Sequence, residues 1–386
     1  MSICIYILIL LFFCKTISCI DEKGILVTHY FSLSRGYILI IKIGSQSDPI
    51  MLNINMVSDR NVIVHQGLEI PNDFYTYQNE SFFYYDELVD SIKLSGNIVM
   101  SYRYNISDFV FNYVTESDNF GSIGLAYKYS DKQSNILYLM KEQGLIKRME
   151  IGFGPETGDE EEGEIYFGGI PSSIKNKRES VSLKVKTIDS YWGTNLQYIS
   201  INNTDTNVYL VKGRAYFQSN IKHIQVPREF FSYLNTTLFH EYIQNQTCYI
   251  EESNNYLQFK CKCFYTQYIP SLTFVIDGIA FDISNRNLFD QYSFKTCSYY
   301  IFASLSDSSS DFILGVSFYK GGYTSFDYEN GLVQFYRKKN KYLRVDMGNY
   351  NKVRYQEMER YMILACNMLL VVASVINILL KRKNYI

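Results

Sequence analysis

The sequence predicts an all-β fold with a few short helices, flanked by apolar segments at both ends of the chain. Aromatic residues make up 16% of the 386 residues, and there are only six Pro. Aromatic side chains pack well on pleated sheets, and a chain this rich in them is not expected to be disordered. Short β-branched runs separated by turn residues recur along the chain, which is the pattern of successive strands.

The first strands are expected near the N-terminus. Tyr37 to Ile43 is an apolar run that ends at Gly44, and Ile50 to Met56 alternates apolar and polar residues. Val62 to Val64 is a further β-branched run. These segments predict hairpins.

A hairpin is also expected near the end of the globular part. Asn330-Gly331 lies between apolar runs in the segment from Asp327 to Phe335, and Asn-Gly is the strongest short hairpin signal.

Two helices are expected between the strands. Ser134 can cap a helix that carries Ile136, Leu137, Leu139 and Met140 and closes at Gly144. A second helix is predicted to begin with Pro227 and to carry Phe230, Phe231 and Leu234.

The N-terminal residues 1–19 are predicted to form a signal peptide. The run from Ile3 to Phe13 is apolar, and the short stretch up to Cys19 can hold a cleavage site. The start lacks a basic residue, so a signal anchor is the alternative, although the run is short for a membrane span.

Residues 362–380 predict a transmembrane helix. At 1.5 Å per residue this segment extends about 28 Å, enough to cross the hydrocarbon core of a bilayer. Lys381-Arg382-Lys383 follow, which predicts a cytosolic tail at residues 381–386 and type I topology with the ectodomain in the secretory lumen or outside the cell. A buried core helix is the alternative. Residues 337–361 are expected to form a juxtamembrane linker.

Cysteines and sequons agree with a secreted ectodomain. Cys248, Cys261, Cys263 and Cys297 predict two disulfides, for which three connectivities are possible. A zinc site at Cys261 and Cys263 is disfavoured because the spacing is too short for a usual ligand pair. Five N-x-[ST] motifs predict possible N-glycosylation, at Asn79, Asn105, Asn202, Asn235 and Asn245.

Charge and motif content exclude several functions. The net charge of −2 gives no general attraction to nucleic acid. The four His are scattered, no Gly-x-Ser-x-Gly elbow is present, and the cysteines have a structural pattern. The acidic stretch at residues 156–164 is expected to be a solvated tip, with a calcium site as the alternative. No metal or cofactor is predicted.

An ordered set of motifs runs along the chain. The parts are Tyr37 to Gly44, Gly121 to Tyr127, Gly163 to Gly169 with its Phe-Gly-Gly end, Trp192 with Leu196 to Ile201, Ile269 to Gly278, Phe312 to Gly315 with Phe318, and Tyr323 to Asp327. In this order they resemble the motifs of the pepsin-like aspartic proteases, over roughly residues 25–337.

This resemblance implies a bilobal fold with a central cleft. The N-terminal lobe is expected at residues 25–180 and the C-terminal lobe at residues 181–336. The resemblance also implies one catalytic aspartate per lobe, because the family's two carboxylates share a proton and together activate a water molecule.

Both aspartate positions are expected to be degenerate. Counting back from Val64 and from Pro227 places them at Met56 and Gln218. The predicted cleft residues around them are Val57, Ser58, Ser219 and Asn220, with Tyr84 or Tyr85 as the flap tyrosine. A thioether and a neutral amide cannot accept a proton from water near neutral pH.

The resemblance also implies a disulfide pairing. Cys263 stands where the family's first cysteine of the second lobe does, which pairs it with Cys297. Cys248 and Cys261 would then close the intervening loop.

Three functions remain open. The first is a pseudoprotease that binds an extended peptide or a partner protein in the cleft. The second is a working aspartic endopeptidase with an unrecognised site, and the third is a structural or adhesion ectodomain.

Overall fold

The structure is a computed structural model that describes most of the chain between Ile25 and Val345. The described residues are 25–33, 36–43, 50–56, 58–64, 75–84, 87–100, 104–114, 121–128, 132–154, 162–184, 191–202, 207–253, 255–291, 295–305, 309–319, 322–338 and 344–345. The predicted signal peptide and the predicted span at 362–380 lie outside these residues. Within them, no helix has both the length and the apolar character needed to cross a membrane.

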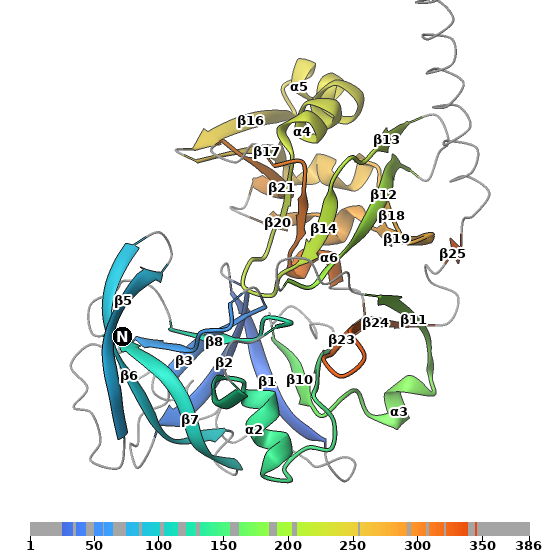
Figure 1. Cartoon of the computed structure of the whole chain (residues 1–386). Coiled ribbons are helices and arrows are strands. Elements are labelled where there is room, and N and C mark those ends of the chain that lie inside the picture. The colour runs from blue at the N-terminus through green and yellow to red at the C-terminus, as the bar shows by residue number, and fades with distance from the viewer. Residues whose placement is uncertain are drawn as a thin grey trace, which may run out of the picture.

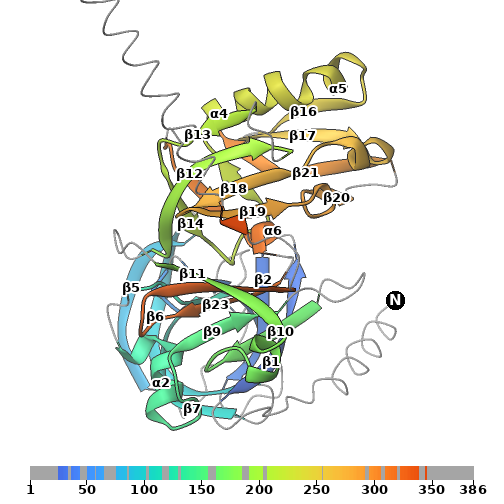
Figure 2. The ribbon, with the colours of Figure 1, turned by 90° about the vertical axis from the view of Figure 1, so that its right-hand side faces the viewer.

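Two large sheets organise the molecule, which confirms the predicted all-β class. The first lobe is built on a 13-stranded sheet and the second on a 12-stranded sheet. The lobes lie one above the other in two perpendicular views (Figures 1 and 2). Buried side chains of both lobes belong to one main apolar core, with Leu52 in the first lobe and Phe217 in the second as examples.

The strands of the first lobe come from both ends of the described chain. In chain order they are β1 (Leu26–Leu33), β2 (Gly36–Ile43), β3 (Ile50–Asn55), β4 (Val62–Val64), β5 (Tyr75–Tyr84), β6 (Glu87–Met100), β7 (Tyr104–Val114), β8 (Gly121–Gly124), β9 (Glu150–Phe153), β10 (Glu162–Phe167), β11 (Arg178–Lys184), β23 (Tyr323–Asp327) and β24 (Leu332–Lys338).

The second lobe contains the remaining strands. They are β12 (Gly193–Ile201), β13 (Val208–Leu210), β14 (Arg214–Phe217), β15 (Ile224–Val226), β16 (Cys248–Ser253), β17 (Tyr256–Lys262), β18 (Leu272–Ile276), β19 (Ile279–Ile283), β20 (Phe289–Gln291), β21 (Thr296–Ser304), β22 (Phe312–Leu314) and β25 (Arg344–Val345).

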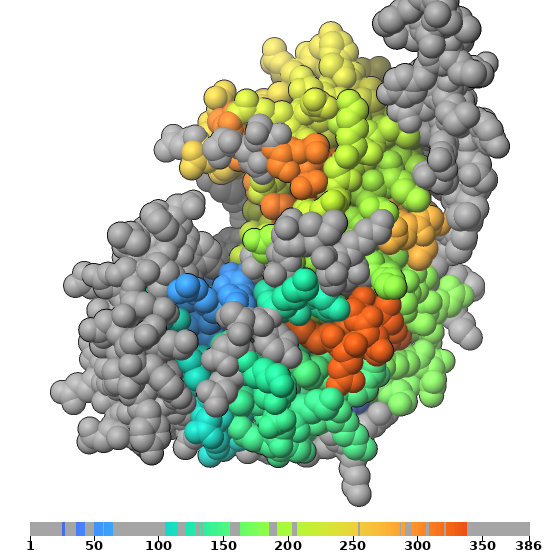
Figure 3. All heavy atoms as spheres, in the orientation of Figure 1, coloured from blue at the N-terminus to red at the C-terminus, as the bar shows by residue number. Residues whose placement is uncertain are grey.

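The sheet boundaries do not follow the predicted division of the chain at residue 180. Strands β11, β23 and β24 lie together at one edge of the first sheet, where β23 pairs with β9. Figure 3 shows the orange-red atoms of this late segment among the green atoms of the first lobe. The C-terminal hairpin therefore completes the N-terminal lobe.

The hairpin predicted at Asn330-Gly331 is present. Asp327 pairs with Leu332, and Gly331 has a φ of 62°. The turn is stabilised by the carboxylate of Asp327, which accepts hydrogen bonds from the backbone N–H groups of Glu329 and Asn330, each at 3.0 Å.

Short helices connect the strands. They are η1 (Lys132–Ser134), α2 (Ile136–Glu142), α3 (Ser172–Lys175), α4 (Arg228–Leu234), η2 (Asn235–Phe239), α5 (His240–Gln244), η3 (Cys263–Tyr268), η4 (Asn285–Asn287) and α6 (Val316–Tyr319). The two predicted helices correspond to α2 and α4, and their predicted apolar residues are buried.

The caps of these two helices differ from the prediction by one residue. Asn135 rather than Ser134 caps α2, because its side-chain oxygen accepts a hydrogen bond from the backbone N–H of Tyr138 at 3.0 Å. Pro227 is the N-cap of α4 rather than its first helical residue.

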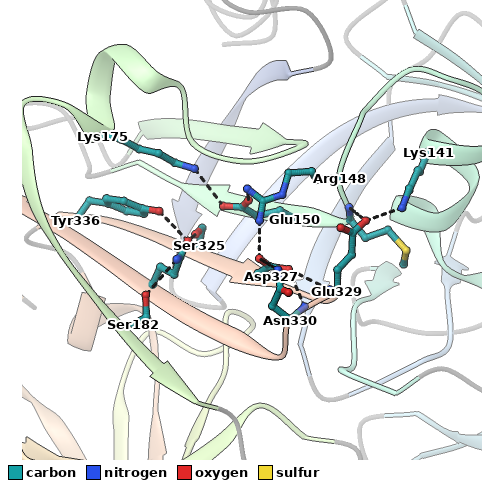
Figure 4. Close-up of polar contacts among 12 residues, drawn as sticks. Lys141, Arg148, Glu150, Lys175, Ser182, Ser325, Asp327, Glu329, Asn330 and Tyr336 are labelled. Atoms are coloured by element: carbon teal, nitrogen blue, oxygen red, sulfur yellow. Dashed lines mark hydrogen bonds and ion pairs between the residues drawn. The ribbon is translucent and has the colours of Figure 1, made fainter.

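A charged network joins β9 to β23 across the first sheet (Figure 4). The Arg148 guanidinium lies 3.1 Å from the Glu150 carboxylate and 2.6 Å from that of Asp327. Glu150 is fully buried. A Cβ on Gly169 would lie 2.7 Å from the Glu150 carboxylate, which explains why the Phe-Gly-Gly motif needs its last glycine.

A neighbouring ion pair fixes the tip of the β23–β24 hairpin. Lys141 lies 2.6 Å from the Glu329 carboxylate, which also accepts a hydrogen bond from the backbone N–H of Met149 at 3.2 Å. The hydrogen bond from Lys141 lowers the pKa of Glu329 below its ordinary value.

Candidate functional site

The second-lobe turn that contains Gln218 follows directly from β14. Phe217 is buried and points into the core, whereas Gln218 is half-buried. The backbone N–H of Gln218 donates to the carbonyl of Leu314 at 3.0 Å, and its carbonyl accepts a hydrogen bond from the hydroxyl of Tyr319. The turn is thus held by β22 and by α6.

Two hydrogen bonds tie this turn to the first lobe. The buried Ser219 hydroxyl donates to the carbonyl of Ile54 in β3 at 2.6 Å. In return, the backbone N–H of Tyr37, at the start of β2, donates to the carbonyl of Ser219 at 2.8 Å. Both bonds join segments far apart in sequence, so they fix how the two turns face each other.

Gly36 permits this close approach. It has a φ of +91°, and a Cβ at this position would lie 2.2 Å from the carbonyl oxygen of Ser219. Glycine adopts such a φ without strain, and it has no Cβ that would clash with this oxygen.

The first-lobe turn is held by backbone bonds to the segment after β8. Leu125 N–H donates to the carbonyl of Asn55 at 2.7 Å, and Ala126 N–H donates to the carbonyl of Ser58 at 2.9 Å. The Asn61 side chain accepts from Gly124 N–H at 3.0 Å and donates to the carbonyl of Val110 at 2.9 Å. Val57, one of the predicted cleft residues, lies outside the described residues.

Strand register matches Asn55, rather than Met56, with Gln218. The same pattern of pairing occurs once in each lobe, around β8, which ends at Gly124, and around β22, which is followed by Gly315. The matching pairs are Ile54 with Ile123 and Phe217 with Leu314, then Val62 with Ser122 and Gln225 with Ile313. The residue after Phe217 is Gln218, and the residue after Ile54 is Asn55.

The pleat of β3 leads to the same correspondence. Leu52, Ile54 and Met56 belong to the main apolar core, and Met56 is fully buried. Successive side chains of a strand point to opposite faces, so Asn55 lies on the other face. Likewise, Phe217 belongs to the core and Gln218 does not.

The alternation of Ile50 to Met56 was visible in the sequence, and it is the signal that could have identified Asn55. Counting back from the Val62 to Val64 run placed the aspartate position of the first lobe at Met56. The turn between β3 and β4 is one residue longer than that count assumes, which moves the position to Asn55. The difference leaves the chemistry unchanged, since neither side chain carries a carboxylate.

The sequence of the second-lobe turn contains no acidic residue, and that of the first-lobe turn contains only Asp59. The chain has no Asp or Glu from Thr206 to Arg228. In the first lobe the nearest is Asp59, whose backbone packs against Gly124, where a Cβ would lie 2.7 Å from the Asp59 carbonyl carbon.

Asn220 follows Ser219 in the second-lobe turn. Its side-chain oxygen is buried and has no hydrogen-bond partner within the described part of the chain. A buried polar oxygen without a hydrogen bond lowers the stability of the folded protein. The hydrogen-bonding capacity of this turn is therefore not fully satisfied.

Of the two predicted flap tyrosines, Tyr84 lies at the end of a long hairpin. Strands β5 and β6 pair from Tyr75 with Ser95 to Tyr84 with Glu87. Tyr84 is therefore the last paired residue of β5. Tyr85 lies outside the described residues.

Both predicted disulfides are present in the second lobe. Cys248 is bonded to Cys261, and Cys263 to Cys297. The first links β16 to β17, and the second links η3 to β21.

The five sequons remain predicted glycosylation sites. Of these, Asn105, Asn202 and Asn245 are exposed and Asn235 is half-buried, whereas the side chain of Asn79 lies outside the described residues.

Comparison with known proteins supports the family. The model for eukaryotic aspartyl proteases matches residues 81–337, more than half of the chain. The crystal structure of the aspartic proteinase from Irpex lacteus is similar with a TM-score of 0.66 at 14% identity, covering 82% of this chain and 98% of that chain. A comparison with curated proteins found no match. The chain therefore belongs to the eukaryotic aspartyl protease family.

Proposed function

We propose that this protein is a membrane-anchored pseudoprotease that binds an extended peptide, or an extended segment of a partner protein, without cleaving it. The observation that carries the proposal is the pair of side chains at the two turns. Gln218 stands at the second position, and Asn55, with Met56 beside it, stands at the first. The family's aspartates are absent from both.

These side chains cannot support the family's reaction. Peptide hydrolysis needs one ionised and one protonated carboxyl group that share a proton and act on one water molecule. The carboxamides of Asn55 and Gln218 neither gain nor lose a proton near neutral pH. Whether Asn55 or Met56 stands at the first position, neither that side chain nor Gln218 can act as a general base.

Binding does not require the missing carboxylates. Carboxamides both donate and accept hydrogen bonds, so they suit the N–H and C=O groups of an extended peptide. Peptides of this kind also pair with strand edges through their backbone. The hydrogen bonds from Ser219 to Ile54 and from Tyr37 to Ser219 support a fixed arrangement of the two turns.

Membrane anchorage is the second part of the proposal. It is supported by the leader at residues 1–19, the apolar segment at 362–380 and the basic residues directly after that segment. The ectodomain would then face the secretory lumen or the outside of the cell.

Cleavage assays on the purified full-length protein test the proposal. Incubated with a denatured protein substrate from about pH 3 to pH 7, it should produce no peptides above the level of a mock purification. Asn55→Asp combined with Gln218→Asp should restore little activity, because Met56 and Asn220 also depart from the family's turn and preorganised geometry is required. Turnover by the unmodified protein that pepstatin inhibits would contradict the proposal.

A further inference from the structure

The exposed apolar and aromatic side chains gather in one region of the second lobe. Among the described residues, seven large hydrophobic side chains are exposed, and five of them lie on β16 and η3. We define the aromatic patch as Tyr249, Phe264, Tyr265 and Tyr268, with exposed fractions of 52%, 69%, 37% and 59%. Single exposed hydrophobic residues are ordinary, but a contiguous group of them marks an interaction surface.

The patch is continuous. The Phe264 ring lies 5.4 Å from that of Tyr265 and 6.2 Å from that of Tyr268, measured between centroids. Tyr249, Phe264 and Tyr265 also line one hollow of about 480 Å³.

The patch is held rigidly in its exposed position. Cys248 and Cys263 tie β16 and η3 to the sheet through their disulfides. The Asn285 side chain donates to the carbonyl of Gln267 in η3 at 2.9 Å, and the hydroxyl of Tyr242 donates to the carbonyl of Tyr268 at 3.0 Å. The aromatic rings are therefore presented by ordered backbone.

Lysines border the patch. Lys262 and Lys295 are exposed and line the same hollow as the rings, whose lining contains no carboxylate. Residues 253–276, which include η3, contain no Asp or Glu. The carboxylates of β16 belong to Glu251 and Glu252, and Glu251 forms an ion pair with Lys260 at 3.0 Å. The hollow beside the rings is therefore cationic and aromatic.

We infer that the aromatic patch contacts the headgroup layer of the bilayer in which the chain is anchored. Tyrosine and phenylalanine place apolar rings at a membrane interface, and lysine is attracted by anionic lipids. Protein interfaces are depleted in lysine relative to arginine, and both cations here are lysines, which favours a lipid surface over a protein partner.

The inference rests on the proposed membrane anchorage, and the connectivity of the chain supports it. Strand β25, which ends at Val345, pairs with β19 of the second lobe. The predicted span begins 17 residues later, at Met362. Such a segment reaches at most about 60 Å, so the second lobe, from which it emerges, lies within that distance of the bilayer.

Fluorescence quenching by brominated lipids tests the contact. The full-length Phe264→Trp variant is reconstituted in nanodiscs of phosphatidylcholine with a minority of phosphatidylserine, with or without bromine on the acyl chains near the headgroup. Bromine should remove about half of the added fluorescence, as expected for a ring at the interface. Trp192, the one native tryptophan, is fully buried and serves as an internal fold reporter.

A matched variant provides the control. Tyr191→Trp places the reporter at an aromatic residue that is 37% exposed but lies outside the patch, and brominated lipid should leave its signal unchanged. Lys262→Glu combined with Lys295→Glu in the Phe264→Trp background should reduce the quenching, and added salt should do the same in the parent.

Two results would overturn the inference, and they are distinguishable. If the protein elutes with the nanodisc but the Phe264→Trp reporter is no more quenched than the Tyr191→Trp reporter, the anchor is present and the patch does not face lipid. If the protein elutes apart from the nanodisc, the proposed anchorage itself fails, and the inference fails with it.

Discussion

Asn55 and Met56 are neighbours in sequence but point to opposite sides of the chain. Met56 is fully buried in the main apolar core, whereas Asn55, which is 9% exposed, lies on the other face of β3 with Asn53 and outside that core. An aspartate at position 56 would therefore bury an unpaired charge, and one at position 55 would not enter the apolar core. We expect Met56→Asp to lower the free energy of unfolding by about 3 kcal/mol or more. Asn55→Asp should cost about 1 kcal/mol.

Urea denaturation of the two variants measures this difference. Met56→Leu is the control, since a volume-conserving apolar exchange should cost less than about 1.5 kcal/mol. If Met56 instead stood at the family's aspartate position, Met56→Asp would restore the family residue and be tolerated. Equal losses for Met56→Asp and Asn55→Asp would thus argue against the register derived from the strand pairing.

The junction between β2 and the Ser219 turn depends on Gly36. Gly36→Ala would place a Cβ 2.2 Å from a backbone oxygen, at a φ of +91°. Backbone must then move, and the hydrogen bond from Tyr37 to Ser219 would be lost. We expect a loss of about 3 kcal/mol in the free energy of unfolding, from the combined clash and backbone strain.

Gly144 provides a matched control for this prediction. It also has a positive φ, +71°, but nothing lies within 4 Å of a Cβ placed there. Gly144→Ala should therefore cost about 1 kcal/mol from backbone strain alone. Similar losses in thermal denaturation of the two variants would show that the contact with Ser219 contributes little.

The C-terminal end of the described chain joins the first lobe where β23 pairs with β9. Arg148 bridges the buried Glu150 and Asp327 at this joint (Figure 4). Arg148→Met leaves the Glu150 carboxylate buried without its nearest cation, and we expect a loss of about 3–5 kcal/mol. Lys175→Met should cost less than about 1 kcal/mol, because its ammonium lies 4.0 Å from Glu150 and is partly exposed.

Two optical probes report whether this loss affects both lobes. Trp192 precedes β12 of the second lobe, and its indole N–H donates to the carbonyl of Leu125 in the first lobe at 3.2 Å. Its fluorescence and the far-UV circular dichroism of the sheets should change at the same, lowered urea concentration in Arg148→Met. If the Trp192 transition stays in place while the dichroism shifts, the joint stabilises the first lobe only.

Local patterns in the sequence were sufficient for the fold class and, with the resemblance to the family, for the prediction that the catalytic aspartates are replaced. Strand alternation, turn residues and helix faces depend on neighbours within a few residues, so β2, β3, the hairpin at Gly331 and helix α4 could be predicted. The lack of carboxylates around Gln218 needed only the sequence and the resemblance to the family. The pairing of Cys263 with Cys297 depended on that resemblance, since spacing alone left three connectivities.

Only the tertiary structure decided which residue of the first lobe corresponds to Gln218 and which strands share a sheet. A one-residue shift moves a side chain to the opposite face of a strand, and the pairing of Ile54 with Ile123 determines that shift for Asn55. The entry of β23 and β24 into the first sheet, and the approach of Gly36 to Ser219, join residues far apart in sequence. Such contacts depend on the free energy of the whole assembled sheet, which no local pattern contains.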